Sequence, residues 1–498
     1  VAGPCNLQHL YPLVLMHFQS FRIPNPRNLF ILLISILPYH FSGGFSPYVS
    51  SRLCRKTLSR QAISKVRDSS HKSVLIENPA VILEQIYEDH GRSFGRYENL
   101  NENRGTASMS KEEEEITVPS ITWARDDICN AKVAALTADP IFNHTIAQMF
   151  REAMTEWWKD HPATSRYTYQ GNQEAHLDAM CAYNETVRHQ VENILHKKIF
   201  PLVRSLFDDL RHEQQLCLYD SLFLRYDGKK LDRRQEAGLP LHRDLGLVSI
   251  NVMLNDDFER GGTFFEGLLK ESMTCHQDDQ NPVLFPKGVG HAILHSSNQR
   301  HAGVTTTRGQ RDIWVIFVTT AELRPQDIAT RLKMMAEASD LEQRKVYLKL
   351  ALKNCPNDGE IWHDLGMTLH SIGKRPPHLV LEYLNRAKEL LPRDARIFNN
   401  IGTMLERHPQ LMKKNQLSSL MAFEQCLRLY KMYSFYNCPD VQHHLETSAW
   451  NYAIVLTNRG LWQPALRVLQ LIRHDSKLAA EAEKLSNVCR SKLSGMGS

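Results

Sequence analysis

Acidic residues are missing from the start of this 498-residue sequence, where no Asp or Glu occurs before Asp68. Arginines do occur there, and an apolar stretch from Leu29 to Leu37 follows Arg27. A basic flank, a short apolar segment and then small residues are the order of a secretory signal. The apolar stretch is shorter than the ~20 residues of a membrane-spanning helix. We therefore expect a signal or targeting presequence over 1–67.

This presequence predicts a location in the secretory pathway, the lumen of the endoplasmic reticulum or Golgi. The piece from Phe45 to Arg67 is rich in Ser and Arg and has no acid, which also fits a plastid transit segment behind a bipartite leader. Membrane contact is expected only if the apolar stretch stays on as an uncleaved anchor.

Cysteine pairs of the CxxC type are also missing, although the chain has ten cysteines. Their absence argues against a zinc ribbon and against a dense disulfide scaffold. Cys181 and Cys217 flank an expected helix and are either bridged or free. The net charge of +5 comes largely from the N-terminal stretch, so no nucleic-acid partner is indicated. A composition of 42% hydrophobic and 23% charged residues is typical of a globular protein.

The chain is too long for one compact core, and its pattern changes several times. Residues 68–119 are polar and predict a disordered linker, with at most a short helix near Val81 to Tyr87. From Ile121 to Leu210 the apolar spacing is helical. Short strands are then expected at Leu218–Tyr226, Val248–Leu254, Thr263–Glu266, Val289–Leu294 and Asp312–Thr319. Helices followed by short strands predict an α+β unit over 120–325, with its strands in a sandwich or jelly roll.

Beyond Pro325 the strand signals stop and a repeat begins. Its first unit contains Ala351, Pro356, Trp362, Leu365 and Gly366, and its second contains Ala387, Pro392, Phe398, Ile401 and Gly402. The spacing of 36 residues is close to the ~34 of a tetratricopeptide helix pair. A third unit holds Trp450, Ala453 and Ala465, displaced by an insertion that contains Met432 to Pro439. The sequence predicts an all-α, tetratricopeptide-like domain over 326–490, in which small residues let the helices approach closely.

Three candidate metal ligands lie within the strand-rich region. His242 and Asp244 are two residues apart at the expected opening of a strand, where they would point to the same side. His301 precedes a later strand, and Arg311 follows it by ten residues. Two histidines and one carboxylate suit a non-haem Fe(II) site with open positions. The planar guanidinium of Arg311 would match the carboxylate of an oxo-acid co-substrate.

Other residues compete for these roles. Arg308 is the alternative anion partner, and His291 and His295 are alternative third ligands. Tyr226 is either a residue of the co-substrate pocket or a core tyrosine.

Three segments carry a resemblance to a known family, and they span about 218–320. They are Phe223-Leu224-Arg225-Tyr226, the stretch from His242-Arg243-Asp244 to Phe258-Glu259-Arg260-Gly261-Gly262-Thr263-Phe264-Phe265, and His301-Ala302-Gly303 continuing to Arg311. They resemble the prolyl- and lysyl-hydroxylase branch of the 2-oxoglutarate/Fe(II)-dependent dioxygenases. The resemblance implies a double-stranded β-helix with iron on His242, Asp244 and His301. It also implies that Arg311 pairs with 2-oxoglutarate and that Tyr226 lines the co-substrate pocket.

The reaction that this resemblance implies consumes O2 and 2-oxoglutarate, releases succinate and CO2, and hydroxylates an unactivated C–H bond. L-ascorbate is an expected helper. The expected substrate is a prolyl or lysyl residue of a peptide or protein, and the C-terminal repeat would bind substrate or a protein partner. In the related collagen prolyl hydroxylases the helical repeats precede the catalytic domain, so the reversed order here leaves that role open. The alternatives are a small-molecule hydroxylase, and a non-catalytic adaptor with an inert jelly roll.

Overall fold

The computed structural model describes residues 79–97, 100, 118–126, 130–161, 172–211, 215–228, 237–270, 281–373, 375–414 and 417–495. The presequence expected over 1–67 lies outside them and stays a prediction. Within the described ranges, no helix is both long enough and apolar enough to cross a membrane. Cys181 and Cys217 are both buried, and neither takes part in a disulfide.

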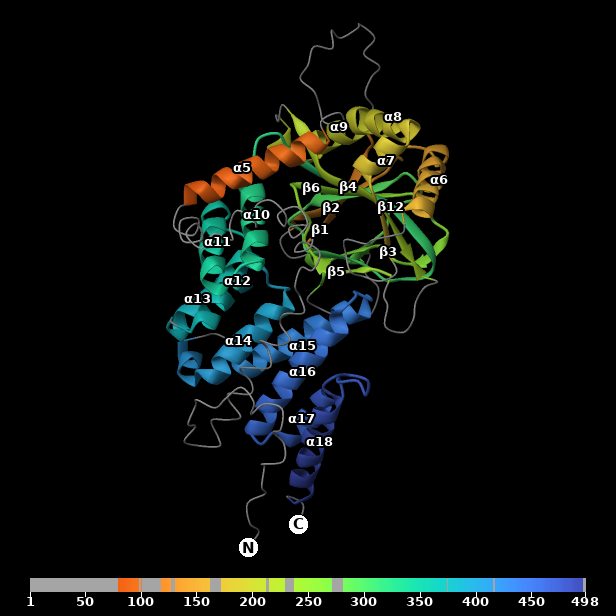
Figure 1. Ribbon diagram of the computed structural model, residues 1–498. Coiled ribbons are helices and arrows are strands. Elements are labelled where there is room, and N and C mark those ends of the chain that lie inside the picture. The colour runs from red at the N-terminus through yellow and green to blue at the C-terminus, as the bar shows by residue number, and fades with distance from the viewer. Residues whose placement is uncertain are drawn as a thin grey trace.

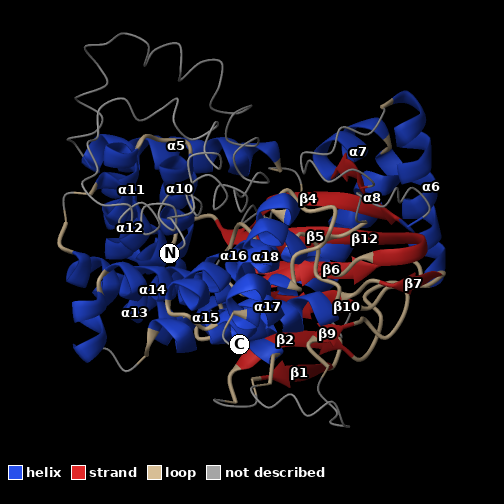
Figure 2. Cartoon of the chain, turned by 90° about the horizontal axis from the view of Figure 1, so that it is seen from below, coloured by secondary structure: helices blue, strands red, loops and turns tan. Residues whose placement is uncertain are grey.

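Two antiparallel sheets form the strand-rich part of the molecule (Figure 2). The strands are β1 (Ile121–Arg125), β2 (Lys132–Thr137), β3 (Asn172–His176), β4 (Leu216–Asp227), β5 (Leu239–His242), β6 (Val248–Met253), β7 (Phe258–Arg260), β8 (Thr263–Phe265), β9 (Val283–Leu284), β10 (Ala292–Ser296), β11 (His301–Gly303) and β12 (Thr306–Thr320). The larger sheet has the order β1-β2-β10-β6-β12-β4-β3, with β7 paired to β12. The smaller sheet has the order β5-β11-β8-β9. Strands of both sheets line one cavity, so the sheets face each other as in a jelly roll.

The strands β4 and β12 are long and apolar on both faces because each face is covered. Alternate residues of a strand point to opposite sides. Phe223 and Trp314 lie in the core between the larger sheet and its helices. The interleaved residues Leu224, Ile313 and Val315 belong to a second cluster that faces the space between the sheets. The odd or even position of a residue along the strand therefore decides whether its side chain faces the helices or the space between the sheets.

The helices fall into two groups (Figure 1). The first group lies over the larger sheet and consists of α6 (His144–Asp160), α7 (Leu177–Tyr183), α8 (Glu185–Ile194) and α9 (Phe200–Leu206). The second group consists of α5 (Pro79–Arg96) and the C-terminal helices α10 (Pro325–Glu337), α11 (Leu341–Asn354), α12 (Gly359–Ile372), α13 (Pro377–Leu390), α14 (Ala395–Arg407), α15 (Ser419–Phe435), α16 (Val441–Asn458), α17 (Trp462–Leu469) and α18 (Ala479–Ser494). Single turns occur at Leu195–Ile199, Asp208–Leu210, Glu266–Leu268 and Pro409–Lys414.

Two expectations for the N-terminal half were wrong. The region from Ile121 to Leu210 is not all helical, because β1, β2 and β3 lie within it. The strand β2 pairs with β1 and β10, and β3 pairs with β4, so tertiary pairing decides these short segments. The helix expected at Val81 to Tyr87 is longer, since α5 runs from Pro79 to Arg96. Ile82 and Ile86 of α5 pack against the C-terminal helices, which explains why this part of the polar segment is ordered.

The C-terminal helices pack in consecutive pairs, and the 36-residue spacing has a physical counterpart in them. A Cβ on Gly366 would lie 3.0 Å from Cβ of Tyr383, and a Cβ on Gly402 would lie 2.9 Å from a ring carbon of Phe423. Glycine at both positions allows the two helices of a pair to touch. The third unit is less regular, and the insertion expected there is not a separate loop, because α15 continues to Phe435.

The second group of helices curves around one side of the sheets and beneath them (Figure 1). The contact between the two parts is apolar and buried, and Phe264 of β8 lies against Tyr433 and Tyr436. This contact brings the starts of α12 and α14 close to the smaller sheet, where the candidate ligands lie.

Candidate metal centre

The two candidate histidines lie on neighbouring strands of the smaller sheet. His242 is the last residue of β5, His301 is the first residue of β11, and the two are direct partners in the antiparallel register. Their ring centroids are 4.4 Å apart. Residues opposite each other in a sheet have side chains on the same face, so the register alone brings these imidazoles together.

Asp244 reaches them from a turn. The sequence predicted that His242 and Asp244 open a strand, but the strand ends at His242 and Asp244 lies two residues beyond it. The backbone N–H of Asp244 donates to the carbonyl of Ser297, 3.0 Å away, which ties this turn to the segment before His301. The predicted convergence is present even though the local structure differs from the one expected.

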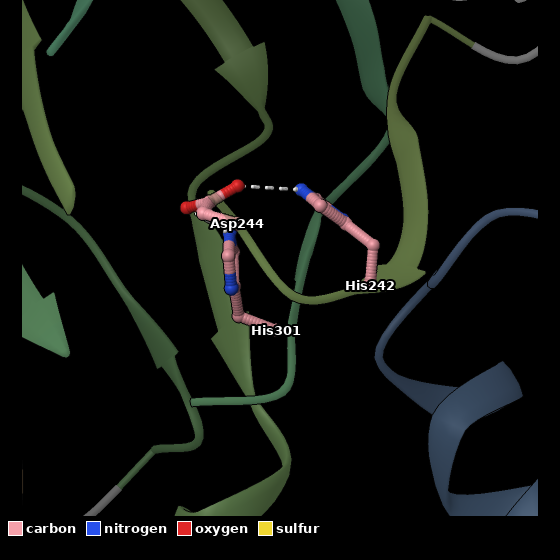
Figure 3. Close-up of side chains that lie close together, drawn as sticks. All are labelled: His242, Asp244 and His301. Atoms are coloured by element: carbon pink, nitrogen blue, oxygen red, sulfur yellow. Dashed lines mark ion pairs between the residues drawn. The ribbon is translucent and has the colours of Figure 1, made fainter. Parts of the chain in front are cut away.

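The ligand atoms of these three residues all lie within 4.8 Å of one another. Nε2 of His242 is 3.2 Å from one carboxylate oxygen of Asp244, and Nε2 of His301 is 3.3 Å from the other. Figure 3 shows the three side chains pointing toward one another.

The far side of each ring is held by the backbone. Nδ1 of His242 lies 2.7 Å from the carbonyl of Pro240, and Nδ1 of His301 lies 3.0 Å from the carbonyl of Gln299. A carbonyl oxygen only accepts, so each Nδ1 carries a proton, and Nε2 is the ring nitrogen that faces the carboxylate. Metal-binding histidines are oriented in this way.

Burial sets the electrostatics of the cluster. It lowers the pKa of His301 to about 3, so this ring is neutral and able to bind a cation at neutral pH. Burial opposes the charged form of His242 too, but the hydrogen bond to Asp244 outweighs it and the pKa of His242 is raised. Burial also opposes the charge on Asp244, yet the neighbouring histidines hold the pKa of its carboxyl well below the usual range. The cluster therefore presents one anion and at least one neutral imidazole.

Arg311 lies on the inner side of β12 and shares a small cavity with the three candidate ligands. It is 3% exposed, and its guanidinium donates to the carbonyl of Gly262 at 3.2 Å. No carboxylate among the described residues is within ion-pair distance of it, and burial lowers its pKa. Its guanidinium carbon lies 5.1 Å from the ring centre of Tyr226, which lines the same cavity. A buried cation without a counterion is costly, so an anionic ligand fits this place.

The structure separates the alternatives from the cluster. Arg308 has a side chain that is 78% exposed and pairs with Glu259. His291 precedes β10 and does not line the cavity. His295 does lie nearby, with Nε2 3.9 Å from Asp244 and without a hydrogen-bond partner, but it is outside the group whose ligand atoms converge.

Two arginines that flank the candidate ligands were not predicted from the sequence. Arg243 lies between His242 and Asp244, and it pairs with Asp358 at 3.3 Å and Glu360 at 3.6 Å. Arg300 precedes His301 and pairs with Glu266 at 2.6 Å and Asp394 at 3.1 Å. The sequence signal for both arginines was their position directly next to a candidate ligand, because adjacent residues of an extended segment point to opposite sides. Their partners on the C-terminal helices, Asp358, Glu360 and Asp394, could not be predicted.

Asn251 was also missed, although a polar residue in the middle of the apolar strand β6 is a visible signal. It pairs with Val315 in the register and lines the same cavity as Arg311.

The donor set fits a divalent metal ion with open positions. Two imidazole nitrogens and one carboxylate oxygen, all from one side, match the ligands of non-haem Fe(II) oxygenases. Arg311 in the adjoining cavity, which makes no ion pair with a described residue, fits a carboxylate co-substrate.

A short segment of the chain is similar to a known protein whose name describes the same chemistry. No protein-family model matches the chain. A segment of 91 residues is 30% identical to a 2-oxoglutarate and iron-dependent oxygenase domain-containing protein, ICU11, of Arabidopsis thaliana. This segment is 18% of the chain and 23% of that relative, so the chain spans less than a quarter of the relative's length.

Solved structures also show similarity. One is a viral collagen prolyl hydroxylase of Paramecium bursaria Chlorella virus-1, at 16% identity and a TM-score of 0.25 over 40% of this chain and 96% of the other. Another is SnoK, a non-haem alpha-ketoglutarate-dependent carbocyclase from nogalamycin biosynthesis, at 16% identity and a TM-score of 0.27 over 36% and 77%. At identities and TM-scores this low, neither structure supports a conclusion about this chain. The fold therefore rests on the pairing of its own strands, and the proposed function on its site.

Proposed function

We propose that the chain is an Fe(II)- and 2-oxoglutarate-dependent dioxygenase that hydroxylates an unactivated C–H bond. The observation that carries this proposal is the convergence of His242, Asp244 and His301 beside a buried Arg311 that has no carboxylate partner among the described residues. The 91-residue similarity to an oxygenase domain-containing protein supports it. An inert adaptor is the weaker alternative, because all four side chains needed for the chemistry are in place.

Each of the four residues has a different role in the proposed reaction. His242 and His301 offer nitrogen lone pairs, and Asp244 offers a negative charge that a divalent cation would neutralise. The guanidinium of Arg311 binds and orients the distal carboxylate of 2-oxoglutarate. Bound iron and 2-oxoglutarate supply the oxidising chemistry, in which O2 is consumed and succinate and CO2 are released. The apolar walls around Arg311, among them Leu224 and Ile313, exclude water from the co-substrate.

A prolyl or lysyl residue of a peptide or protein is the substrate that we propose, with L-ascorbate as a helper that keeps the iron reduced. The support for this finer assignment is the resemblance of the segments around Tyr226, His242 and His301 to prolyl and lysyl hydroxylases. The tetratricopeptide-like character of the C-terminal helices belongs to the same proposal, and it rests on the 36-residue spacing of Gly366 and Gly402.

The decisive experiment measures succinate. The purified full chain is incubated with Fe(II), 2-oxoglutarate, ascorbate and air, with and without a proteome-derived peptide library. We expect succinate to depend on iron, and mass spectrometry to find peptides that gain one oxygen atom on proline or lysine. Succinate at the level of the iron-free reaction would show that the chain is not this enzyme. Succinate without any oxidised peptide would instead point to a small-molecule substrate.

A further inference from the structure

A second and larger cavity opens on the other side of the candidate ligands. It has a volume of about 1040 Å³ and lies between strands of both sheets and the C-terminal helices, and we call it the cleft. His242 and Asp244 line both the cleft and the small cavity that holds Arg311. A metal ion on these residues would therefore face the co-substrate cavity on one side and the cleft on the other.

The helical wall of the cleft comes mainly from alternate helices. Its residues on α12 include Glu360, His363, Asp364, Met367 and Thr368; those on α14 are Arg396, Asn399 and Asn400; those on α16 are His444, Thr447 and Ser448. Within each helix these residues are spaced by three and four, so they occupy one face. The first helix α10 lines the cleft as well, and among the second helices α13 and α17 contribute none, whereas α11 and α15 contribute Leu341, Arg344, Leu348, Asn354 and Tyr430. The first helices of successive pairs thus form most of the helical wall of the cleft.

Hydrogen-bonding side chains form a continuous row along this wall. His363 donates from Nδ1 to Asp364 at 2.8 Å and accepts at Nε2 from Asn400 at 2.9 Å. Asn399 donates to Asn400 at 3.3 Å and accepts from Asn451 at 3.3 Å. A side-chain amide has two N–H donors and an oxygen with two lone pairs, so Asn399 and Asn400 retain capacity after these bonds. A row of amides is suited to the repeated N–H and C=O groups of an extended backbone.

The charges of the cleft favour a cation. Its basic side chains are already engaged: Arg243 and Lys333 pair with Asp358 and Glu360, Arg396 pairs with Glu360 and Asp394, and Arg344 donates to the backbone carbonyls of Ala336, Glu337 and Ser339.

Asp209 and Asp364, in contrast, are carboxylates of the cleft that make no ion pair with a Lys or Arg in the described part of the chain. The Asp364 side chain is 36% exposed. An acidic segment would meet these carboxylates and find each basic side chain already occupied.

We propose that the cleft binds an extended polypeptide segment with neutral or basic residues beside its target, and that the amide row holds the segment's backbone next to His242 and Asp244. This inference rests on the proposed function, because it names the substrate class of that same site. It assigns the inner faces of α12, α14 and α16 to substrate binding.

The test uses two fluorescent peptides built from Pro-Pro-Lys and Pro-Pro-Glu triplets, since proline holds both in the same extended conformation. Their binding to the full chain is followed by fluorescence anisotropy with Fe(II) and 2-oxoglutarate but without oxygen, so that no turnover occurs. We expect the lysine peptide to bind about tenfold more tightly than the glutamate peptide at low salt, and the difference to shrink as salt is added. Equal affinities, or binding of neither peptide, would overturn the proposal.

Variants locate the binding surface. Asp364→Lys places a cation in the cleft and should abolish the preference for the lysine peptide. The control Asp475→Lys makes the same charge change at a side chain that is 79% exposed and lies outside the cleft, and it should keep the full preference. Asn400→Leu should weaken the binding of both peptides by the same factor, because it removes a hydrogen-bonding partner of the peptide backbone and changes no charge. An unchanged preference in Asp364→Lys would place the peptide elsewhere.

The dioxygenase assignment and the peptide-binding cleft are tested by different measurements, so either proposal can fail without the other. Succinate formed by the wild-type chain without any peptide tests the dioxygenase assignment alone. Peptide binding without oxygen tests the cleft alone.

Discussion

The sheet pair and the C-terminal helices contribute to the candidate metal centre in different ways. The sheets supply its functional groups, because pairing of β5 with β11 sets His242 beside His301 and alternation along β12 turns Arg311 inward. The helices supply charges that hold the backbone on which those groups lie. Asp358 and Asp394 are the N-caps of α12 and α14, and through Arg243 and Arg300 they contact the residues next to the ligands.

Two successive helix pairs contribute equivalent residues to the same candidate site. Asp358 and Asp394 are separated by the same 36 residues as Gly366 and Gly402, so they occupy equivalent places in successive units. Both cap a helix and both bind an arginine of the sheet region. The difference between the two regions can be tested, since variants of the sheet ligands should act on chemistry, and variants of the helix N-caps and of the close contacts between helices should act on stability.

The largest effect is expected from the sheet ligands. His301→Ala removes one of three converging donors, and we expect no succinate above the metal-free background. The matched control is His291→Ala, which removes a histidine close in sequence that does not line the cavity, and it should retain turnover. If the His301 variant still made succinate, this residue would not belong to the site.

A smaller but specific effect is expected from the anion partner. Arg311→Ala should raise the KM for 2-oxoglutarate about a hundredfold, because a charge-assisted hydrogen bond is lost in a buried cavity. Iron affinity should change far less. Arg308→Ala serves as the control, since its guanidinium is exposed and paired with Glu259. Equal losses of iron and 2-oxoglutarate affinity would contradict the assigned role.

Helix variants should act on the free energy of unfolding. Asp394→Ala should destabilise the fold by about 3–5 kcal/mol, because Arg300 and Arg396 are left buried without this partner. Glu259→Ala, which breaks an exposed pair, should cost about 0–1 kcal/mol. Urea denaturation measures both values. Similar small costs for the two variants would show that the buried contact between the regions is weak.

The smallest effect tests the close approach of the helices. Gly402→Ala forces a Cβ to within 2.9 Å of the Phe423 ring and should cost about 1–3 kcal/mol. Gly91→Ala lies on an exposed part of α5 with no atom within 4 Å, and it should stabilise the protein by about 0.5–1 kcal/mol. Thermal unfolding of the two variants should therefore shift in opposite directions.

The sequence was most informative where spacing alone determines geometry. The strand at β6 begins at its predicted residue, Val248, because the β-branched and apolar residues of this segment alternate with Ser249 and Asn251 at the period of a strand. Prediction was poorer at β2, where Lys132–Thr137 has a composition that suits a helix and becomes a strand by pairing with β1 and β10. The strand β12 begins at Thr306, six residues before the predicted start, because its polar first half pairs with β7.

By itself the sequence determined which residues are candidates for the chemistry, since the residue types and intervals of His242, Asp244, His301 and Arg311 match a metal ion and an anion. Only the tertiary structure decided how they meet. Asp244 arrives from a turn held by the carbonyl of Ser297, and the opposite wall of the site comes from helices more than fifty residues further along the chain. Spacing along one segment fixes direction within that segment, whereas contacts between distant segments depend on how their buried faces pack, and no local pattern encodes that.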